Sequence, residues 1–249
     1  MAILVFQHSK LSDAGHLGNA LRKHGQKVRT VKVHEGQALP ADLDDVHGVV
    51  SLGGPQSAND AHPWVAQEQA LLREAHQAGI PVLGLCLGAQ MLAKALGGEV
   101  ARMTAPEIGW VQVKAASIGV EDVLHPGIGW SQTVFASHGE HVSKLPDGAT
   151  LVMKGTACPV QAFRVGATSY GFQYHPEWTR DIILAEVDCW KDAELQAAGT
   201  DKARLRQSTA EHYPTAERNS TRLFEAVNLV LFPASRQQRG LVAPGWIHH

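Results

Sequence analysis

The chain has 249 residues, of which 44% are hydrophobic and 18% charged, and its net charge is −2. This composition is typical of a globular protein with a sizeable core, and the near-neutral charge gives no reason to expect a nucleic acid or an acidic membrane surface as partner. No apolar run is long enough to span a bilayer. The apolar N-terminus lacks a basic start and a small-residue cleavage site, so we interpret it as a first strand and not as a signal peptide.

Strand and helix patterns alternate over the first hundred residues. Short apolar runs predict strands, and stretches with helical spacing that end at glycine or begin at proline predict the helices between them. The predicted strands are 3–6, 28–33, 46–52 and 81–85, and the predicted helices are 13–24, 63–78 and 88–96. Repeated strand-helix-strand units indicate an α/β fold, with a mostly parallel central sheet and helices on both faces.

The second half of the chain is rich in strands. Alternating runs at 110–113, 133–136, 150–153 and 160–165, separated by turn signals at Pro126-Gly127 and 146–148, predict a partly antiparallel region.

Beyond Glu177 the pattern becomes helical again. Lys191–Pro214 reads as a polar, exposed helical excursion, and a core-facing stripe follows at Leu223, Ala226, Val227, Val230 and Leu231. We therefore expect one domain over 1–249, with a helical C-terminal extension at about 186–249.

The three cysteines are Cys86, Cys158 and Cys189. A sparse, odd set makes no disulfide framework and is typical of a reducing cytoplasm, where Cys86 would remain a free thiol. Cys158 and Cys189 have no histidine at useful local spacing, so we interpret both as structural. No Cys and His pair has the spacing of a zinc site and no phosphate loop is present, so we expect neither a metal nor a cofactor.

Cys86 has the setting of a nucleophile elbow. It ends an apolar strand, lies two residues from Gly84 and from Gly88, and is followed at once by a helical pattern. The thiolate is the attacking species, and the helix N-terminus after Cys86 would favour it. A free cysteine is more often a small buried hydrophobe, and for an isolated Gly-x-Cys-x-Gly that alternative stays open.

His175 and Glu177 form a candidate base and its orienting group. Residues two apart on an extended chain point the same way, and Pro176 between them suits a strand end. The carboxylate would hold the imidazole in one tautomer while the other ring nitrogen faces the thiol. The alternative is a strand-end histidine beside a solvated glutamate.

Two further segments carry polar or glycine-rich patterns after a strand. Ser51–Ser57 contains Gly53-Gly54-Pro55, whose backbone N–H groups could face an oxyanion together with the N–H of Leu87, or it is a plain turn. Ala136–Glu140 is a polar insert after an apolar strand, and it reads as a binding loop or a turn.

These four elements, in this order, resemble the class I (triad-type) glutamine amidotransferases. The resemblance runs from residue 1 to about 185 and is most specific at 84–90 and 172–177, while 51–55 and 137–140 are similar to the glutaminase domain of GMP synthetases. It implies a flavodoxin-like class I amidotransferase fold. The implied roles are Cys86 as nucleophile, His175 as base and acid, Glu177 as its orienting partner, the N–H groups of Gly54 and Leu87 as oxyanion hole, and Gln90, Ser137 and His138 as holders of the amino-acid end of glutamine.

The implied reaction is hydrolysis of the side-chain amide of glutamine through a γ-glutamyl thioester on Cys86, with release of ammonia. No synthetase domain follows the motifs, so we expect the ammonia acceptor on a separate synthetase or acceptor subunit, or no acceptor. Ala89 stands where the family often carries a bulkier residue. An alternative is therefore a γ-glutamyl peptidase or hydrolase acting on other γ-glutamyl amides, and a third is a non-catalytic regulatory relative.

Overall fold

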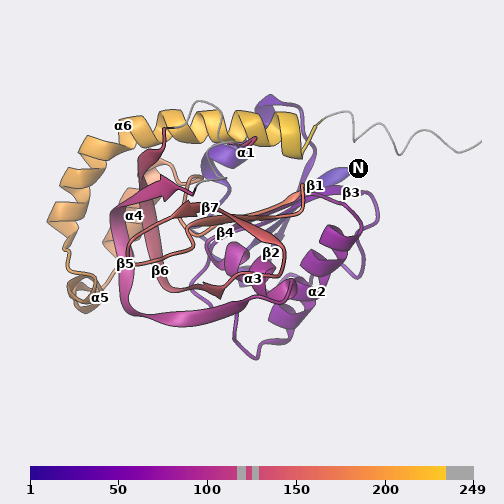
Figure 1. The fold of residues 1–249 in the computed structure, drawn as a ribbon, viewed down its shortest axis with the longest axis horizontal. Coiled ribbons are helices and arrows are strands. Elements are labelled where there is room, and N and C mark those ends of the chain that lie inside the picture. Colours follow the sequence, from indigo (N-terminus) through magenta and orange to yellow (C-terminus); the bar gives the residue numbers. More distant parts are fainter. Residues whose placement is uncertain (117–121, 125–128, 234–249) are drawn as a thin grey trace, which may run out of the picture.

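The computed structural model describes residues 1–116, 122–124 and 129–233. Within these ranges the strands form one nine-stranded sheet in the order β2-β1-β3-β4-β9-β8-β7-β5-β6 (Figure 1). The strands are β1 (Ala2–Gln7), β2 (Val28–Lys32), β3 (Val46–Ser51), β4 (Val82–Leu85), β5 (Glu99–Ala115), β6 (Ser131–Lys144), β7 (Ala149–Lys154), β8 (Ala162–Val165) and β9 (Ser169–Phe172). The helices are α1 (Gly15–Lys23), α2 (Pro63–Gln77), α3 (Leu87–Ala95), α4 (Arg180–Cys189), α5 (Asp192–Ala197) and α6 (Lys202–Ala226). The expected turn at Pro126-Gly127 and the end of the expected extension, 234–249, lie outside the described residues.

The sheet has a parallel and an antiparallel half, as the sequence predicts. Strands β2, β1, β3, β4 and β9 run parallel, and β8, β7, β5 and β6 continue the sheet in antiparallel pairs. Strand β9, which we did not predict, forms a hairpin with β8 and pairs with β4 in the parallel direction. It therefore carries the chain from the second half back to the strand that ends at Cys86.

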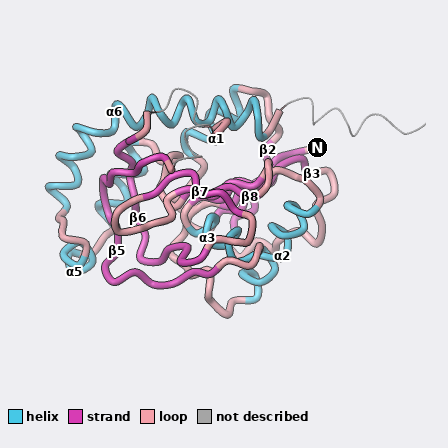
Figure 2. The backbone as a smooth tube through the Cα atoms, in the orientation of Figure 1, coloured by secondary structure: helices cyan, strands magenta, loops and turns pink. Residues whose placement is uncertain are grey.

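Helices cover both faces of the parallel half. Alternate residues of β1 enter different cores: Ile3 and Val5 pack with buried residues of α1 and α6, and Leu4 and Phe6 pack with those of α2 and α3. In Figures 1 and 2, α1 and α6 lie on one side of the sheet and α2 and α3 on the other. A third core, over β5 and β6, is closed by α4, α5 and α6.

The long ribbon of β5 and β6 corrects two predictions. We predicted strands only at 110–113 and 133–136, because much of the rest of the ribbon is exposed and shows no apolar alternation. The segment Ala136–Glu140, expected to be a loop or turn, lies inside β6 and pairs with β5. Its polar side chains are therefore placed by strand register.

The C-terminal stripe is confirmed except at one residue. Leu223, Ala226, Val227 and Leu231 are buried, but Val230 is 46% exposed. The reason is a π-turn over Val227–Leu231, which widens the last turn and rotates Val230 away from the core. No helix in the described ranges has both the length and the apolar character that a membrane span needs.

Candidate active site

Cys86 stands at the junction of β4 and α3 with a strained backbone. Its φ is 52° and its ψ −106°, and Asp45 is the one other non-glycine residue with positive φ in the described ranges. Such a conformation costs an L-residue free energy and persists only where its surroundings enforce it. Here the Cys86 N–H donates to the carbonyl of Phe172 on β9, at 2.7 Å. The predicted sharp strand-to-helix turn is present, and it lies at the carboxyl end of the parallel strands.

The two glycines around Cys86 allow this turn. A Cβ at Gly84 would lie 2.5 Å from the carbonyl oxygen of Gly88, and a Cβ at Gly88 would lie 2.0 Å from the carbonyl oxygen of Ser51 on β3. Both distances are far inside van der Waals contact with main-chain atoms, which cannot move without displacing a strand. The start of α3 therefore reaches the sheet only because both positions lack a side chain.

Replacing Gly88 with alanine is accordingly expected to destabilise the protein by about 3 kcal/mol or more, since overpacking against backbone cannot be relieved by a rotamer change. The free energy of unfolding from a denaturant titration measures this. Gly129→Ala is the matched control, because that glycine is exposed and its nearest contact would be an ordinary 3.5 Å. A Gly88→Ala protein as stable as the Gly129→Ala control would contradict this account of the elbow.

His175 and Glu177 lie in the turn that follows β9, and not on an extended strand as we expected. The ring Nδ1 is 2.8 Å from Oε1 of Glu177, whose side chain is fully buried. The His175 N–H donates to the carbonyl of Phe135 on β6, at 2.9 Å. The carboxylate is therefore not solvated, in contrast to the simpler alternative, and it fixes the orientation of the imidazole.

Burial and charge act in opposite directions on His175. Burial lowers the pKa of the imidazole, but the Glu177 carboxylate and then Cys86 raise it further than burial lowers it, to about 10. The ring of Trp178 stacks on the imidazole, with centroids 3.7 Å apart and an interplanar angle of 17°. The imidazole is thus held on one edge by a carboxylate and on one face by an indole.

Cys86 and His175 meet although they are far apart along the chain. A Cβ on Gly53 would lie 2.8 Å from Cε1 of His175 and 3.5 Å from Cβ of Cys86, so both side chains contact the same glycine. Both also line one cavity of about 180 Å³. The fold therefore brings the predicted nucleophile, base and orienting carboxylate together at one end of the sheet.

The Gly53-Gly54 segment lies beside the sulfur. Gly54 lines the same cavity as Cys86, and Leu87 is the first residue of α3, where a backbone N–H has no acceptor within its own helix. These two positions are the ones predicted to offer N–H groups to an oxyanion.

A buried polar network supports this segment from below. His8, on the loop after β1, bonds through Nδ1 to the carbonyl oxygen of Leu52 at 3.0 Å and through Nε2 to Glu68 at 2.8 Å. Glu68 also accepts from the hydroxyl of Ser51 at 2.6 Å. Burial lowers the pKa of His8, but the charge of Glu68 and the hydrogen bonds raise it by more, so that the net pKa is raised. The network ties the loop after β1 to the end of β3.

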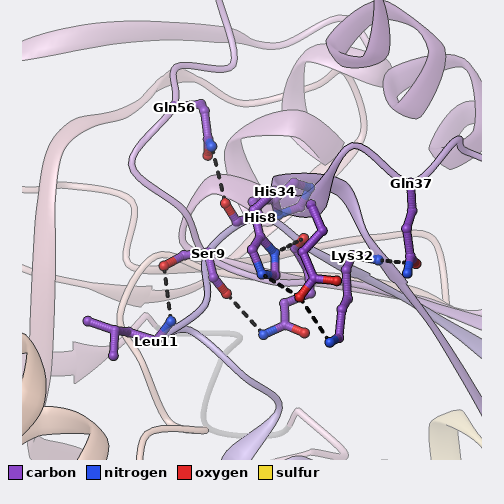
Figure 3. A network of polar contacts seen from close by, with 9 residues as sticks. His8, Ser9, Leu11, Lys32, His34, Gln37 and Gln56 are labelled. Carbon is purple, nitrogen blue, oxygen red and sulfur yellow. Dashed lines mark hydrogen bonds and ion pairs between the residues drawn. The ribbon is translucent and has the colours of Figure 1, made fainter.

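The loop after β1 is also held by contacts visible in Figure 3. Gln56 donates to the main-chain oxygen of His8 at 3.1 Å, and the Leu11 N–H donates to the hydroxyl of Ser9 at 3.2 Å. Ser9 and Leu11 both line the cavity at Cys86. We did not predict this contribution from the N-terminal loop, although loops at the carboxyl ends of parallel strands are the usual place for a site.

Gln90, Ser137 and His138 line a second cleft, which also borders Cys86 and adjoins the first cavity. The Gln90 amide nitrogen donates to the carbonyl of Glu140 at 2.9 Å and to the side-chain oxygen of Gln173 at 3.2 Å. His138 Nδ1 is 3.0 Å from the same Glu140 carbonyl. The Cys86 thiol lies 3.7 Å from the carbonyl of Ser137. The segments expected to hold substrate thus border the sulfur, with several of their polar atoms already bound to protein.

Residues 12–181, well over half of the chain, match the family model described as Glutamine amidotransferase class-I. The chain belongs to this family. It is an α/β enzyme of the class-I glutamine amidotransferases, and hydrolysis of a glutamine amide is the chemistry of that class.

Relatives of this class-I amidotransferase include stand-alone chains and parts of larger enzymes. It is 29% identical to the glutamine amidotransferase-like protein YfeJ of Salmonella typhimurium, over 82% of this chain and 86% of that protein. It is 36% identical to a GMP synthase of Aeropyrum pernix over 70% of this chain, but spans only 33% of that enzyme. The crystal structure of a glutamine amidotransferase from Methylobacillus flagellatus superimposes with a TM-score of 0.81 and 27% identity, covering 100% of this chain and 98% of the other.

The segment after Glu177 also contributes to the amidotransferase site. Glu186, on α4, and Trp190, directly after it, line the cavity that holds Cys86 and His175. Burial raises the pKa of Glu186 while the neighbouring charge of His175 lowers it, and the net pKa is raised. Trp178, directly after Glu177, lines the same cavity, whereas the polar pattern beyond it predicted only an exposed helical excursion.

Proposed function

We propose that the protein hydrolyses the side-chain amide of glutamine through a triad of Cys86, His175 and Glu177. The observation that carries the proposal is the strained Cys86 beside a buried imidazole that is hydrogen-bonded to a buried carboxylate. A cysteine that only fills space in the core does not need a strained positive φ. A His175–Glu177 pair exposed to solvent would not raise the pKa of His175. The arrangement matches a nucleophile, its general base and the group that orients the base.

Acylation follows from the positions of these groups. The Cys86 thiolate attacks the side-chain carbonyl carbon, and the oxygen takes up the negative charge facing the N–H groups of Gly54 and Leu87. The carbon–nitrogen bond then breaks as His175 donates a proton to the nitrogen, which leaves as ammonia. The product on the enzyme is a γ-glutamyl thioester.

Deacylation reverses the proton path. A water molecule gives a proton to His175 while its oxygen attacks the thioester carbon, and the thiolate of Cys86 leaves. Glutamate is released and the triad is restored. Because a reactive thiolate is oxidised more readily outside a reducing compartment, we expect the protein to act in the cytoplasm.

The two cavities that border the sulfur of Cys86 would hold different parts of the substrate. Gln90, Ser137 and His138 border the cleft that would hold the amino-acid end of glutamine. The other cavity, lined by His175, Trp178 and the segment after Glu177, lies on the side from which the leaving group takes its proton. A separate synthetase or acceptor subunit would have to receive ammonia from this side.

This second cavity also favours a second candidate function. Its volume of about 180 Å³ is more than ammonia needs, and Trp190 and Glu186 form part of its wall. An enzyme that cleaves γ-glutamyl peptides or other γ-glutamyl amides would place its larger leaving group there. The thioester chemistry on Cys86 is the same for both candidates.

A substrate panel separates the two candidates. We expect the purified protein to release ammonia from glutamine, measured at steady state beside glutamate release from γ-glutamyl peptides. A kcat/KM for peptides at least about tenfold above that for glutamine would favour the second candidate, since a better-filled pocket is worth roughly this factor.

Inertness toward every compound in the panel would count against both candidates. Stoichiometric labelling of Cys86 by a diazo-ketone analogue of glutamine, read by mass spectrometry, then tests the triad without turnover. A protein that is neither active nor labelled would be a non-catalytic relative, and the proposal would fall.

A further inference from the structure

Three ligating side chains meet behind the β6 wall of the cleft. They are the carboxylate of Glu107 on β5, the imidazole of His138 on β6 and the thiol of Cys158 between β7 and β8, and one ligand atom from each lies within 4.8 Å of the other two. His138 and Cys158 are 5% and 0% exposed, and the Glu107 side chain is 10% exposed. The cluster is outside the triad. His138 also borders the cleft proposed for the amino-acid end of glutamine, whereas Glu107 and Cys158 have no part in the proposed reaction.

The hydrogen bonds of His138 leave one ring nitrogen directed at this cluster. Nδ1 lies 3.0 Å from the Glu140 carbonyl, which can only accept, so the proton of a neutral ring is on Nδ1. Nε2 then carries a lone pair. It lies 3.1 Å from Oε2 of Glu107 without hydrogen-bond geometry to any group in the described part of the chain. A lone pair and a carboxylate oxygen at this distance repel each other unless a proton or another cation lies between them.

The geometry points to a binding site for a zinc-type divalent cation formed by Glu107, His138 and Cys158. Thiolate, imidazole and carboxylate are the donors that Zn²⁺ takes in proteins, at about 2.0 to 2.3 Å. In a tetrahedral site such bonds place neighbouring ligand atoms roughly 3.3 to 3.8 Å apart. Nε2 of His138 and Oε2 of Glu107 are already 3.1 Å apart. Side-chain rotations of Cys158 and Glu107 that move their ligand atoms by about an ångström would complete the tetrahedral geometry.

The surroundings provide what a metal site needs beyond its ligands. The Glu140 carbonyl orients the His138 ring through Nδ1, and the Gln161 amide nitrogen donates to Oε2 of Glu107 at 2.8 Å, so two ligands have outer partners. The side-chain oxygen of Gln161 is buried without a hydrogen-bond partner among the described residues and is a candidate fourth donor. Glu107 lines a surface cleft, which gives the cation a route from solvent.

Binding would replace a thiol proton with the cation. The proton of the Cys158 thiol would leave to solvent as the sulfur binds the cation, because a cysteine ligates as the thiolate. Because His138 is one residue from Ser137, whose carbonyl faces the Cys86 thiol, the cation would also fix the strand that borders the sulfur.

A cobalt titration tests the site without relying on activity. The protein is prepared metal-free with Cys86→Ala and Cys189→Ser, so that Cys158 is the one thiol left, and Co²⁺ is added while the absorption spectrum is recorded. We expect one Co²⁺ per chain, a thiolate-to-cobalt charge-transfer band and the intense visible bands of four-coordinate cobalt, all displaced by one equivalent of Zn²⁺. Cys158→Ser in the same background should remove the charge-transfer band.

Two further variants keep the test decisive if Cys158→Ser does not fold. Glu107→Gln should weaken cobalt binding at least about tenfold, whereas Glu99→Gln, an exposed residue of the same strand, should not change it. Absence of cobalt binding at millimolar metal, or binding without a thiolate band, would overturn the proposal. Failure here leaves the glutamine hydrolysis proposal untouched, because the protein tested has no nucleophile.

Discussion

Replacing Cys86 with alanine is expected to lower kcat/KM for glutamine by at least about 10³-fold, because removing a covalent nucleophile leaves only residual catalysis from binding and the oxyanion site. Steady-state ammonia release measures the effect. The matched control is Cys189→Ser, since that thiol is exposed on α4. We expect it to retain the wild-type rate. A Cys86→Ala protein that still released ammonia within about tenfold of the wild type would rule out the thioester route.

The strained backbone at Cys86 allows a second prediction, which concerns stability and not activity. Alanine keeps the strained φ of 52°, whereas glycine adopts positive φ freely. Cys86→Gly should therefore be more stable than Cys86→Ala by about 1 kcal/mol in a denaturant titration, although neither is active. Equal stability of the two variants would mean that the elbow stores no strain, and that its geometry is not what selects the cysteine.

The parallel half of the fold could be predicted because its signals are local. Buried strands such as β3 and β4 are short apolar runs, and a glycine follows each of them within three residues. The elbow was visible for the same reason, since Gly84, Cys86 and Gly88 lie within five residues. Family resemblance then ordered the distant motifs, which no periodicity could join.

What the sequence could not provide depends on pairing between distant segments. The β5–β6 ribbon is held by register and by few buried side chains, so its polar stretch at Ala136–Glu140 resembled a loop. The Glu107–His138 pair exists only because that register sets the two residues opposite each other. Cys158 joins them from a third segment, which is why local spacing showed no metal ligands.

Replacing Glu177 with glutamine should reduce kcat for glutamine by about 10² to 10⁴. The amide keeps the size of the side chain but removes the charge that opposes burial at His175. Burial is the largest single effect on this imidazole and lowers its pKa, so without the carboxylate the pKa falls from about 10. The pH profile of kcat/KM should move to lower pH with the loss of rate.

Glu186→Gln is the control, because Glu186 lines the same cavity and its charge also acts on His175. Glu186→Gln should lower kcat by less than about tenfold. Equal losses of kcat in both variants would mean that any negative charge in the cavity suffices, and that the contact between Glu177 and Nδ1 of His175 has no special role.

Glu177→Gln should also change how the free energy of unfolding depends on pH, and the direction of the change follows from the pKa of His175. Wild-type His175 has a folded pKa raised above its ordinary value of 6.5, so its protonation stabilises the fold fully below about pH 6.5, and this contribution is lost as the pH rises toward about 10. In Glu177→Gln the largest effect that raises the folded pKa of His175 is removed, and the contribution is smaller throughout this window. The wild type should therefore exceed the variant in free energy of unfolding most at pH 6.5, and the difference should shrink steadily toward pH 10. A difference that stayed constant, or that grew with pH, would show that the carboxylate does not hold a proton on His175. The imidazole beside Cys86 would then be neutral at neutral pH.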